Sequence, residues 1–323
     1  MVQVTVGARL HFGFQNLSLA HERLYGGLGV ALESPTVSVE AHPADEIRCD
    51  DSRARKYARC ATDLLGVPGV DVRVHETLPS HVGLGSGTQL ALTVLAAVAR
   101  AYDRQPAVRE NAPELDRGGR SGVGVSTFEE GGFVVDAGHP TERFTTDRPS
   151  RGEWFVPPVV ASHAIPAEWR FVVVLPETKP GRSGDDEDES MRSVVERADP
   201  TIANDISTVL LRRALPAIVG DDPERFGDAV AEIGRLNGAW YADEQGGVYR
   251  PPVGELVTEM EDSPAIFGAG QSSWGPAVYG VTTRARADGA VEAAQLALDS
   301  VDVAGDVSVA RPRNSGASVN GKQ

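Results

Sequence analysis

Apolar and polar residues alternate in three early segments of the chain. Val2, Val4 and Val6 are separated by polar residues, and the same period recurs at Val37 and Val39 and from Val70 to Val74. A period of two places successive side chains on opposite faces of an extended strand. The pattern therefore predicts three half-buried strands, and the apolar run within residues 131–137 predicts a fourth.

Helical patterns follow these strands. Residues 53–65 predict a helix that ends at Gly66, and residues 86–102 predict a helix that is apolar on nearly every side and therefore central to its domain. The second half of the chain continues with both kinds of element. It predicts helices at 201–219, 223–241 and 290–301, and strands at 171–175, 265–267, 277–281 and 307–310.

The elements and the chain length together indicate two domains of the α+β class. A chain of 323 residues exceeds the ~100 to 200 residues of a usual domain, and strands and helices alternate without the regular repeat of a doubly wound sheet. We interpret the proline-rich residues 156–166 as a connector and place the boundary near residue 165. The expected division is 1–164, 165–317 and a disordered tail at 318–323.

The excess of acidic residues predicts the environment and the partners of the protein. The chain has 31 basic and 46 acidic residues, which gives a net charge of −15, and only Lys56, Lys179 and Lys322 are lysines. Such a surface is typical of proteins in a salt-loaded cytoplasm, where screening makes excess negative charge tolerable. The acidic field argues against nucleic acid as a partner. The acidic run 185–189 is interpreted as a solvated loop.

The cellular compartment is predicted from the absence of targeting and membrane-spanning patterns in this sequence. We find no signal-peptide pattern, and the longest apolar stretch, residues 90–99, is shorter than the ~20 residues that cross a bilayer. We expect a soluble cytoplasmic protein without a membrane partner. Cys49 and Cys60 have no histidine pair at metal-ligand spacing, so we expect two ordinary thiols.

The stretch HVGLGSGTQLAL, residues 81–92, carries the clearest chemical signal. Gly83, Gly85 and Gly87 lie between a predicted strand and a predicted helix, where backbone N–H groups and the helix N-terminus together attract an anion. Ser86 and Thr88 would add hydroxyl ligands or cap the helix. The alternative is a tight turn without a ligand, because the spacing matches neither the Walker A loop nor the dinucleotide fingerprint.

Two further glycine-rich segments favour a ligand over a turn. Residues 118–132 read GGRSGVGVSTFEEGG, and residues 268–280 read GAGQSSWGPAVYG. Three such segments in one chain are difficult to explain as turns alone.

With these motifs the chain resembles the GHMP superfamily of small-molecule kinases and their relatives. The motifs are PSHVGLGSGTQ at 79–89, SGVG at 121–124 and GAGQSS at 268–273. The resemblance implies a ribosomal S5 domain 2-like N-terminal domain and a ferredoxin-like C-terminal domain. It also implies phosphate binding by the first loop, at Gly83, Leu84, Gly85, Ser86, Gly87, Thr88 and Gln89.

Departures from the kinase motifs point to one branch of that superfamily. Gly124 stands where such a kinase carries its catalytic aspartate, and residues 271–274 read QSSW where the kinases have more glycine. Together with GARLHFGF (7–14), GGLGVAL (26–32), LPETKPGRSG (175–184) and RPRNSGA (311–317), the chain resembles the β-ribofuranosylaminobenzene 5'-phosphate synthases of archaeal pterin biosynthesis. That resemblance implies condensation of phosphoribosyl pyrophosphate with 4-aminobenzoate or 4-hydroxybenzoate, with release of CO2 and pyrophosphate.

Candidate site residues follow from this chemistry. Arg9 and His11, at the end of the first strand, are proposed to contact pyrophosphate or the substrate carboxylate, since a guanidinium grips either group. Arg120 and Ser121 are candidates for the 5'-phosphate. The other candidate substrate contacts are Gly270, Gln271, Ser272 and Ser273 in the late loop, and Arg313 and Asn314, with Arg311, near the C-terminus.

Departure of pyrophosphate usually requires a divalent ion, so Mg²⁺ is the expected cofactor. Glu129, Glu130 and Asp136 are the weak candidates for its ligands. Two other functions remain open: an ATP-dependent kinase, disfavoured by Gly124, and a nucleotide or anion sensor without catalysis. The choice of benzoate also stays open, and the resemblance makes a homodimer plausible.

Overall fold

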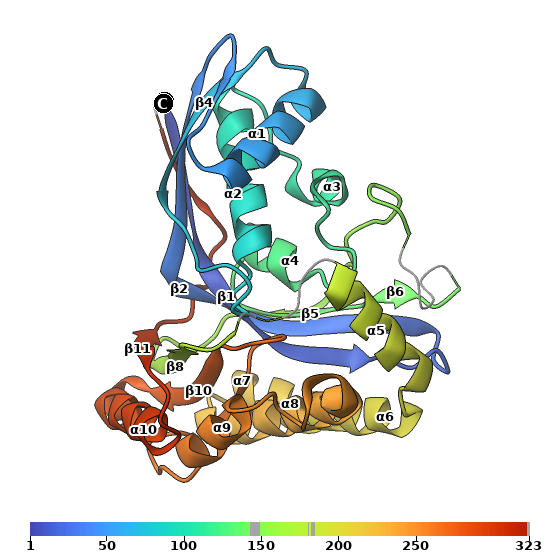
Figure 1. Ribbon diagram of the computed structural model, residues 1–323, viewed down its shortest axis with the longest axis vertical. Helices are drawn as coiled ribbons and strands as arrows, with labels where there is room; N and C mark the ends of the chain where they lie inside the picture. Colours follow the sequence, from blue (N-terminus) through green and yellow to red (C-terminus); the bar gives the residue numbers. More distant parts are fainter. Residues whose placement is uncertain (143–148, 180, 182–184, 322–323) are drawn as a thin grey trace.

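Two long strands, β1 (Val2–Asn16) and β2 (Arg23–Pro43), form the antiparallel hairpin on which the fold is built. The structure is a computed structural model that describes residues 1–142, 149–179, 181 and 185–321. In Figure 1 the hairpin descends through the upper part of the molecule and then bends to lie across the helices of the lower part. The β1–β2 register shifts between Gly7 and Arg9 and between His11 and Gly13, and such bulges bend a strand.

These two shifts correct one expectation. Arg9 and His11 do not lie at the end of the first strand, because β1 continues to Asn16. They lie between the two irregularities of the β1–β2 register.

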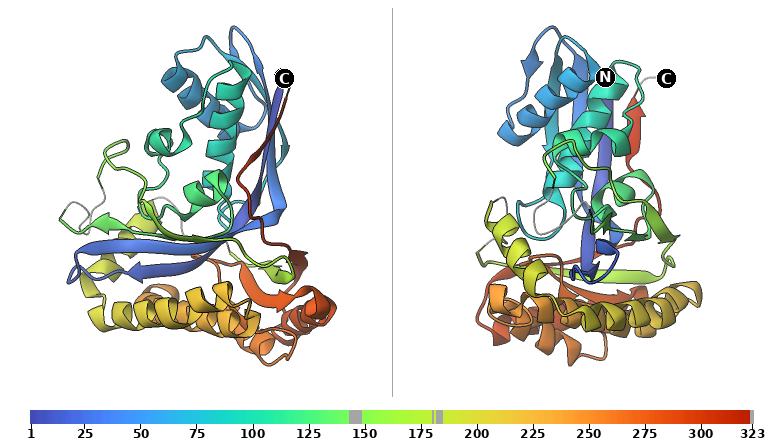
Figure 2. Two further views of the ribbon diagram at one scale, coloured as in Figure 1. Left: turned by 180° about the vertical axis from the view of Figure 1, so that it is seen from behind. Right: turned by 90° about the vertical axis from the view of Figure 1, so that its right-hand side faces the viewer.

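The first sheet surrounds this hairpin, in the order β12-β1-β2-β4-β3, and β5 joins β2 to β7. Helices α1 and α2 pack on one of its faces, as the two views in Figure 2 show. The remaining elements of this part are β3 (Ile47–Arg48), α1 (Ser52–Leu65), β4 (Val70–Glu76), α2 (Ser86–Ala101), α3 (Val108–Asn111), a 3-10 turn (Pro113–Leu115), α4 (Val123–Glu129), β5 (Phe133–Asp136), β6 (His139–Pro140), β7 (Val159–His163) and β12 (Ser318–Gly321).

Local signals account for the two helices that the pattern predicted. Asp51 caps α1 by accepting from Ala54 N, and Gly66 ends it in the left-handed conformation with φ 58°. Residues 89–99 of α2 are all buried, as expected for a helix at the centre of its domain. Both predictions are confirmed.

The second sheet has the strand order β11-β8-β10-β9, and all of its pairs are antiparallel. This is the order of a ferredoxin-like sheet, so the α+β prediction and its ferredoxin-like part are confirmed. Its elements are β8 (Trp169–Pro176), α5 (Asp185–Arg197), α6 (Pro200–Val209), a π-helical turn (Leu210–Ala214), α7 (Leu215–Val219), α8 (Pro223–Gln245), α9 (Val253–Glu261), β9 (Gly268–Gln271), β10 (Val278–Thr283), a 3-10 turn (Arg284–Arg286), α10 (Ala287–Ser300) and β11 (Gly305–Ala310).

The C-terminal segment corrects the expected tail. Residues 318–321 form β12 on the edge of β1, with Ser318 opposite Thr5 and Gly321 opposite Val2. An edge strand has unpaired N–H and C=O groups, and the tail satisfies them. The chain returns to the first sheet earlier still, because Arg313 O accepts from Gly132 N at 2.7 Å. Residues 322–323 lie outside the described residues.

Three other segments differ from their predictions. The supposed connector contains β7, which pairs with β5, and the acidic run 185–189 begins helix α5. The strand expected at 265–267 forms instead at Gly268–Gln271. The glycines of β9 allow close packing, because a Cβ at Gly268 would lie 2.2 Å from Gly227 O in α8.

Two further predictions concern the cysteines and membrane-spanning helices. Cys49 and Cys60 are both free thiols, as expected. Among the helices that the structure describes, none combines the length and the apolar character that crossing a bilayer requires.

Candidate active site

The glycine loop before α2 presents backbone N–H groups to a cleft. Gly83 and Gly85 have φ of 93° and 80°, a region in which other residues are strained. Gly85 occupies the N-cap of α2, and no side chain of the described residues caps this end. The N–H groups of the first turn, which have no partner inside a helix, are therefore available to an anion.

The late glycine segment packs directly on this loop. Gly83 O accepts from Arg9 Nη1 at 2.6 Å and from Ser272 Oγ at 2.7 Å. A Cβ at Gly83 would lie 2.2 Å from Ser272 O, so only glycine permits this approach. His11 N donates to Ser272 Oγ at 3.0 Å. Segments that are nearly 200 residues apart in sequence thus form one wall.

Positive charge gathers in the cleft in front of the loop. Gly83, Gly85, Ser86, Gly87 and Thr88 line it, together with Arg9, Arg53, Lys56 and Arg117. Burial lowers the pKa of Arg9 to about 10, so this guanidinium stays charged at neutral pH. The cleft holds about 1350 Å³, part of which is open to solvent. Asp116 and Glu187 are its acidic residues.

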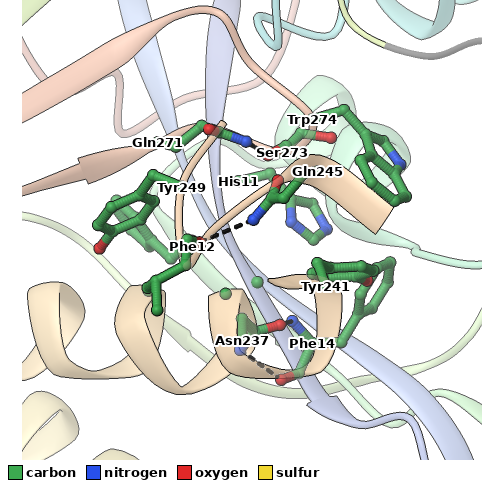
Figure 3. Close-up of a pocket in the computed structure, with 14 residues that line it drawn as sticks. His11, Phe12, Phe14, Asn237, Tyr241, Gln245, Tyr249, Gln271, Ser273 and Trp274 are labelled. Carbon is green, nitrogen blue, oxygen red and sulfur yellow. Dashed lines mark hydrogen bonds between the residues drawn. The ribbon is translucent and has the colours of Figure 1, made fainter. Parts of the chain in front are cut away.

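An aromatic pocket adjoins the cleft (Figure 3). The two cavities share Ser273 and Trp274. The ring of Trp274 packs against Tyr241 from α8 with centroids 4.7 Å apart, and His11 meets Phe14 edge-on at 5.0 Å. The space between its side chains amounts to about 450 Å³ when the open solvent at its mouth is included.

A buried hydrogen-bond chain leads away from His11. Its Nε2 lies 3.1 Å from Ser121 Oγ, and that hydroxyl donates to Asp136 Oδ2 at 3.3 Å. Burial, and after it the nearby charge of Arg9, lower the pKa of His11 to about 3. His11 is therefore neutral at neutral pH, with Nε2 as the protonated nitrogen that donates to Ser121.

Asp136 anchors the other end of this chain. It accepts from Gly122 N at 2.7 Å and from Gly138 N at 2.8 Å. Burial nevertheless raises its pKa to about 6, against the opposing effect of these hydrogen bonds. Asp136 thus holds the central glycine segment in place and lines neither the cleft nor the pocket.

The structure separates the predicted loop residues into two groups. Leu84 is a core side chain, and Gln89 is buried with its Nε2 donating to Gly124 O at 3.1 Å. Neither of the two lines the cleft. Gln271 and Ser273 line the aromatic pocket, whereas Ser272 joins the two glycine loops. Gly270 lies in β9, where a Cβ would meet Tyr279 Oη at 2.7 Å.

Three candidates for anion contacts are engaged elsewhere. Arg120 pairs with Glu187 at 3.0 Å and with Asp188, both on α5, so this part of the acidic run is not a free solvated loop. Arg313 Nη2 donates to Gly316 O at 2.8 Å. The side-chain amide of Asn314 binds the backbone of Ile165, because Oδ1 accepts from Ile165 N and Nδ2 donates to Ile165 O, each at 2.8 Å. These side chains, like Arg311, line neither cavity.

The proposed magnesium ligands do not converge. Glu129 pairs with Arg109 at 2.8 Å, Asp136 is saturated by donors, and Glu130 is exposed. Among the residues that the structure describes, no three His, Cys, Asp or Glu side chains form a cluster that could hold a metal ion. The Mg²⁺ expectation therefore has no support from these three residues.

Sequence reasoning missed most of the aromatic pocket and one wall of the cleft. Asn237, Tyr241 and Tyr249 come from the second half of the chain, and the pattern marked the first two only as part of a helix. Arg53 and Lys56 had a detectable signal, since a spacing of three puts both on one face of the predicted helix.

Comparison with known proteins agrees with this architecture. Residues 52–132 match the family model described as the GHMP kinases N terminal domain. A solved mevalonate kinase from Methanococcus jannaschii is 14% identical, with a TM-score of 0.67, 97% of this chain covered and 98% of that one. At that identity the likeness shows the fold, which confirms the GHMP-kinase-like prediction.

Two curated relatives carry the comparison further. A β-ribofuranosylphenol 5'-phosphate synthase of Methanothermobacter thermautotrophicus is 33% identical over 297 residues, covering 86% of this chain and 88% of the relative. One from Archaeoglobus fulgidus is 30% identical over 296 residues, covering 87% and 88%. The resemblance seen in the motifs is thereby confirmed: the chain belongs to the β-ribofuranosylphenol 5'-phosphate synthase family and has the GHMP kinase fold.

Proposed function

We propose that this protein is a pentosyltransferase that condenses phosphoribosyl pyrophosphate with a 4-substituted benzoate and releases CO2 and pyrophosphate. One observation carries the proposal: a cationic cleft fronted by a glycine loop meets an aromatic pocket at Ser273 and Trp274. A reaction between a diphosphorylated sugar and an aromatic ring needs these two environments side by side.

The relatives' printed name favours one acceptor. Their product name contains a ribofuranosylphenol, and a phenol arises when 4-hydroxybenzoate loses its carboxyl group at the carbon that gains the ribose. We therefore propose 4-hydroxybenzoate, with 4-aminobenzoate as the competing acceptor.

The bond changes in this proposal balance without a further reactant. The bond from the anomeric carbon to the diphosphate breaks, and Arg9 with the N–H groups of the α2 first turn stabilises the departing negative charge. The ring carbon that carries the carboxylate attacks the anomeric carbon. The bond to the carboxylate then breaks, CO2 leaves, and its electron pair restores aromaticity.

No protein base is required, since no ring proton is removed at that carbon. Neutral His11, with a pKa of about 3, is a very weak base and agrees with this scheme. We propose that it orients the acceptor at the mouth of the aromatic pocket and that Arg9 contacts the diphosphate. Mg²⁺ remains a proposal, because a magnesium diphosphate needs only one or two protein carboxylates. Glu187 is the candidate ligand, since it lines the cleft and its charge raises the pKa of Arg9.

The kinase alternative meets a steric obstacle. A Cβ at Gly124 would lie 3.0 Å from Thr88 Cγ2 and 3.3 Å from Thr88 Cβ, so an aspartate there would require Thr88 to shift by a few tenths of an ångström. Phosphoryl transfer to an alcohol relies on such a base or orienting group.

The deciding assay uses carboxyl-labelled 4-hydroxybenzoate, phosphoribosyl pyrophosphate and Mg²⁺ in molar KCl. We expect labelled CO2 and pyrophosphate in equal amounts, faster than with 4-aminobenzoate, and a rate at least tenfold lower for Arg9→Ala. ATP consumption with a small alcohol and no label release would favour the kinase. Tight binding of phosphoribosyl pyrophosphate without turnover would favour the sensor. Repeating the assay with chelator tests Mg²⁺.

A further inference from the structure

The outer wall of the cleft is not used by the chemistry above. Arg53 and Lys56 lie three residues apart on α1, and Arg117 faces them from the segment before α4. Tyr57, next to Lys56, also lines this wall. The wall lies beside the first turn of α2, and none of its four side chains lines the aromatic pocket.

Arg117 is held in place by contacts with uncharged groups. Its guanidinium lies about 3.4 Å from where a Cβ of Gly87 would be, and it sits over the Tyr57 ring at 5.6 Å. Its Nη2 donates to Tyr57 Oη, while Trp154 Nε1 donates to Arg117 O at 2.9 Å and fixes the backbone. Arg117 Nε is buried without a partner among the described residues.

Arg53 is fixed in a similar way. Its Nη1 donates to Ser80 Oγ, in the segment that leads into the glycine loop. Within the described part of the chain, no ion pair joins Arg53, Lys56 or Arg117 to a carboxylate. What distinguishes these three cations in a chain with a net charge of −15 is that they line the same cleft as the glycine loop. Their convergence there indicates a place for an anion from outside.

We propose that Arg53, Lys56 and Arg117 form a phosphate-monoester subsite that binds the 5'-phosphate of the sugar substrate. This assignment rests on the proposed function. The diphosphate is attached to the reacting anomeric carbon, so it must lie near the aromatic pocket. Arg9 is on that side, two residues from His11 on β1. The other end of the sugar is then directed to the outer wall.

The residue types suit a monoester. Two guanidinium groups offer planar pairs of donors to phosphate oxygens, and Lys56 adds a point charge at the rim. Arg120, the earlier candidate for this phosphate, is already paired with Glu187 and Asp188. The subsite would also select phosphorylated over unphosphorylated sugars, because an unphosphorylated sugar leaves the three cations without a counter-charge.

Binding of two probes tests the subsite without turnover. Ribose 5-phosphate carries only the monoester, and inorganic pyrophosphate mimics only the leaving group. For Arg53→Ala/Lys56→Ala we expect at least tenfold weaker binding of ribose 5-phosphate by calorimetry and less than threefold change for pyrophosphate. Arg9→Ala should show the reverse. Arg59→Ala, an exposed change on α1 outside the cleft, is the control and should bind both probes like wild type.

Equal weakening of both probes, or unchanged binding of ribose 5-phosphate, would overturn the subsite. Arg117→Lys adds a second measure, because it keeps the charge and loses the planar donors. We expect it to raise KM for phosphoribosyl pyrophosphate at least tenfold with a smaller change in kcat. If labelled CO2 never appears but the probes still discriminate, the proposed function fails and the subsite stands. If CO2 appears and the probes do not discriminate, only the subsite fails.

Discussion

Asn237 holds the backbone of Phe14 through both atoms of its side-chain amide. Phe14 N donates to Asn237 Oδ1 at 2.7 Å, and Asn237 Nδ2 donates to Phe14 O at 3.0 Å. The contact joins α8 of the second sheet's part to β1 of the first. Gly13, with φ 137°, permits it, because a Cβ there would lie 2.4 Å from the Asn237 amide carbon. Both halves of the molecule therefore shape one wall of the aromatic pocket (Figure 3).

Asn237→Asp should remove the donor half of this contact with little change in the shape of the side chain. An ionised carboxylate still accepts from Phe14 N but donates nothing to Phe14 O or Ile233 O, which Asn237 Nδ2 also reaches. We expect a loss of about 1–3 kcal/mol in the free energy of unfolding, the usual cost of buried polar groups without partners. Urea denaturation measures it. Asn204→Asp, at an exposed position of α6, makes the same charge change and should alter stability little. Similar losses in both variants would refute the role of the Asn237 contact.

Gly124→Asp tests whether an aspartate at this position can be accommodated beside Thr88 and whether it gives the protein kinase activity. The added side chain must displace Thr88, whose Cγ2 would lie 3.0 Å from its Cβ. Overpacking of this kind costs about 1–3 kcal/mol, and the buried carboxylate adds to it. We expect a lower melting temperature, no ATP-dependent phosphorylation of small alcohols and reduced CO2 release.

Gly124→Asp/Thr88→Ala is the matched variant, since it makes space for the carboxylate. We expect it to recover part of the stability and still to phosphorylate nothing. Phosphoryl transfer by this double variant would show that the chain is a kinase that lacks one residue.

The elements that the sequence predicted well are those with local signals. The cap at Asp51, the left-handed Gly66 and the apolar surface of α2 are all encoded within a few residues. The glycine loop is also local, because its conformation depends on φ values that glycine alone adopts easily. These features therefore needed no knowledge of the rest of the fold.

The aromatic pocket had no such signal. His11 and Tyr241 meet only because the β1–β2 hairpin crosses α8, and a helical pattern at 223–241 does not say which face it turns to that hairpin. The tail was misjudged for the same reason. Residues 318–321 are exposed and include one large apolar side chain, Val319, and they become a strand because β1 offers an unpaired edge.

His11→Gln should change how stability responds to acid. Folding lowers the pKa of His11 from 6.5 to about 3, so between these values the unfolded chain binds a proton that the folded chain does not. Stability from this group is present above pH 6.5 and is lost as pH falls, by up to about 1.4 kcal/mol per pH unit. We expect the variant to lose less stability than wild type between pH 6.5 and 4, measured by urea denaturation.

Asp136 acts in the opposite direction within part of that range. Its pKa rises on folding from 3.8 to about 6, so the folded chain binds the extra proton and stability from this group falls as pH rises through that interval. Asp136 is present in both proteins, and the comparison therefore isolates His11. Parallel stability curves for wild type and variant would show that His11 is not held neutral by the fold.

Trp274→Ala should separate acceptor binding from sugar binding. Trp274 borders both cavities, and its ring packs at a tilt against Tyr241 in the aromatic pocket, with centroids 4.7 Å apart. An aromatic contact of this kind contributes about 0.5–1.5 kcal/mol, which corresponds to about a 2- to 12-fold rise in KM for the benzoate. We expect a smaller rise in KM for phosphoribosyl pyrophosphate, because we propose that its diphosphate binds at Arg9 and the glycine loop. Trp274→Phe keeps an aromatic ring and should recover most of the acceptor affinity. A larger rise for the sugar than for the benzoate would place the acceptor elsewhere, because the aromatic pocket would then have no part in binding it.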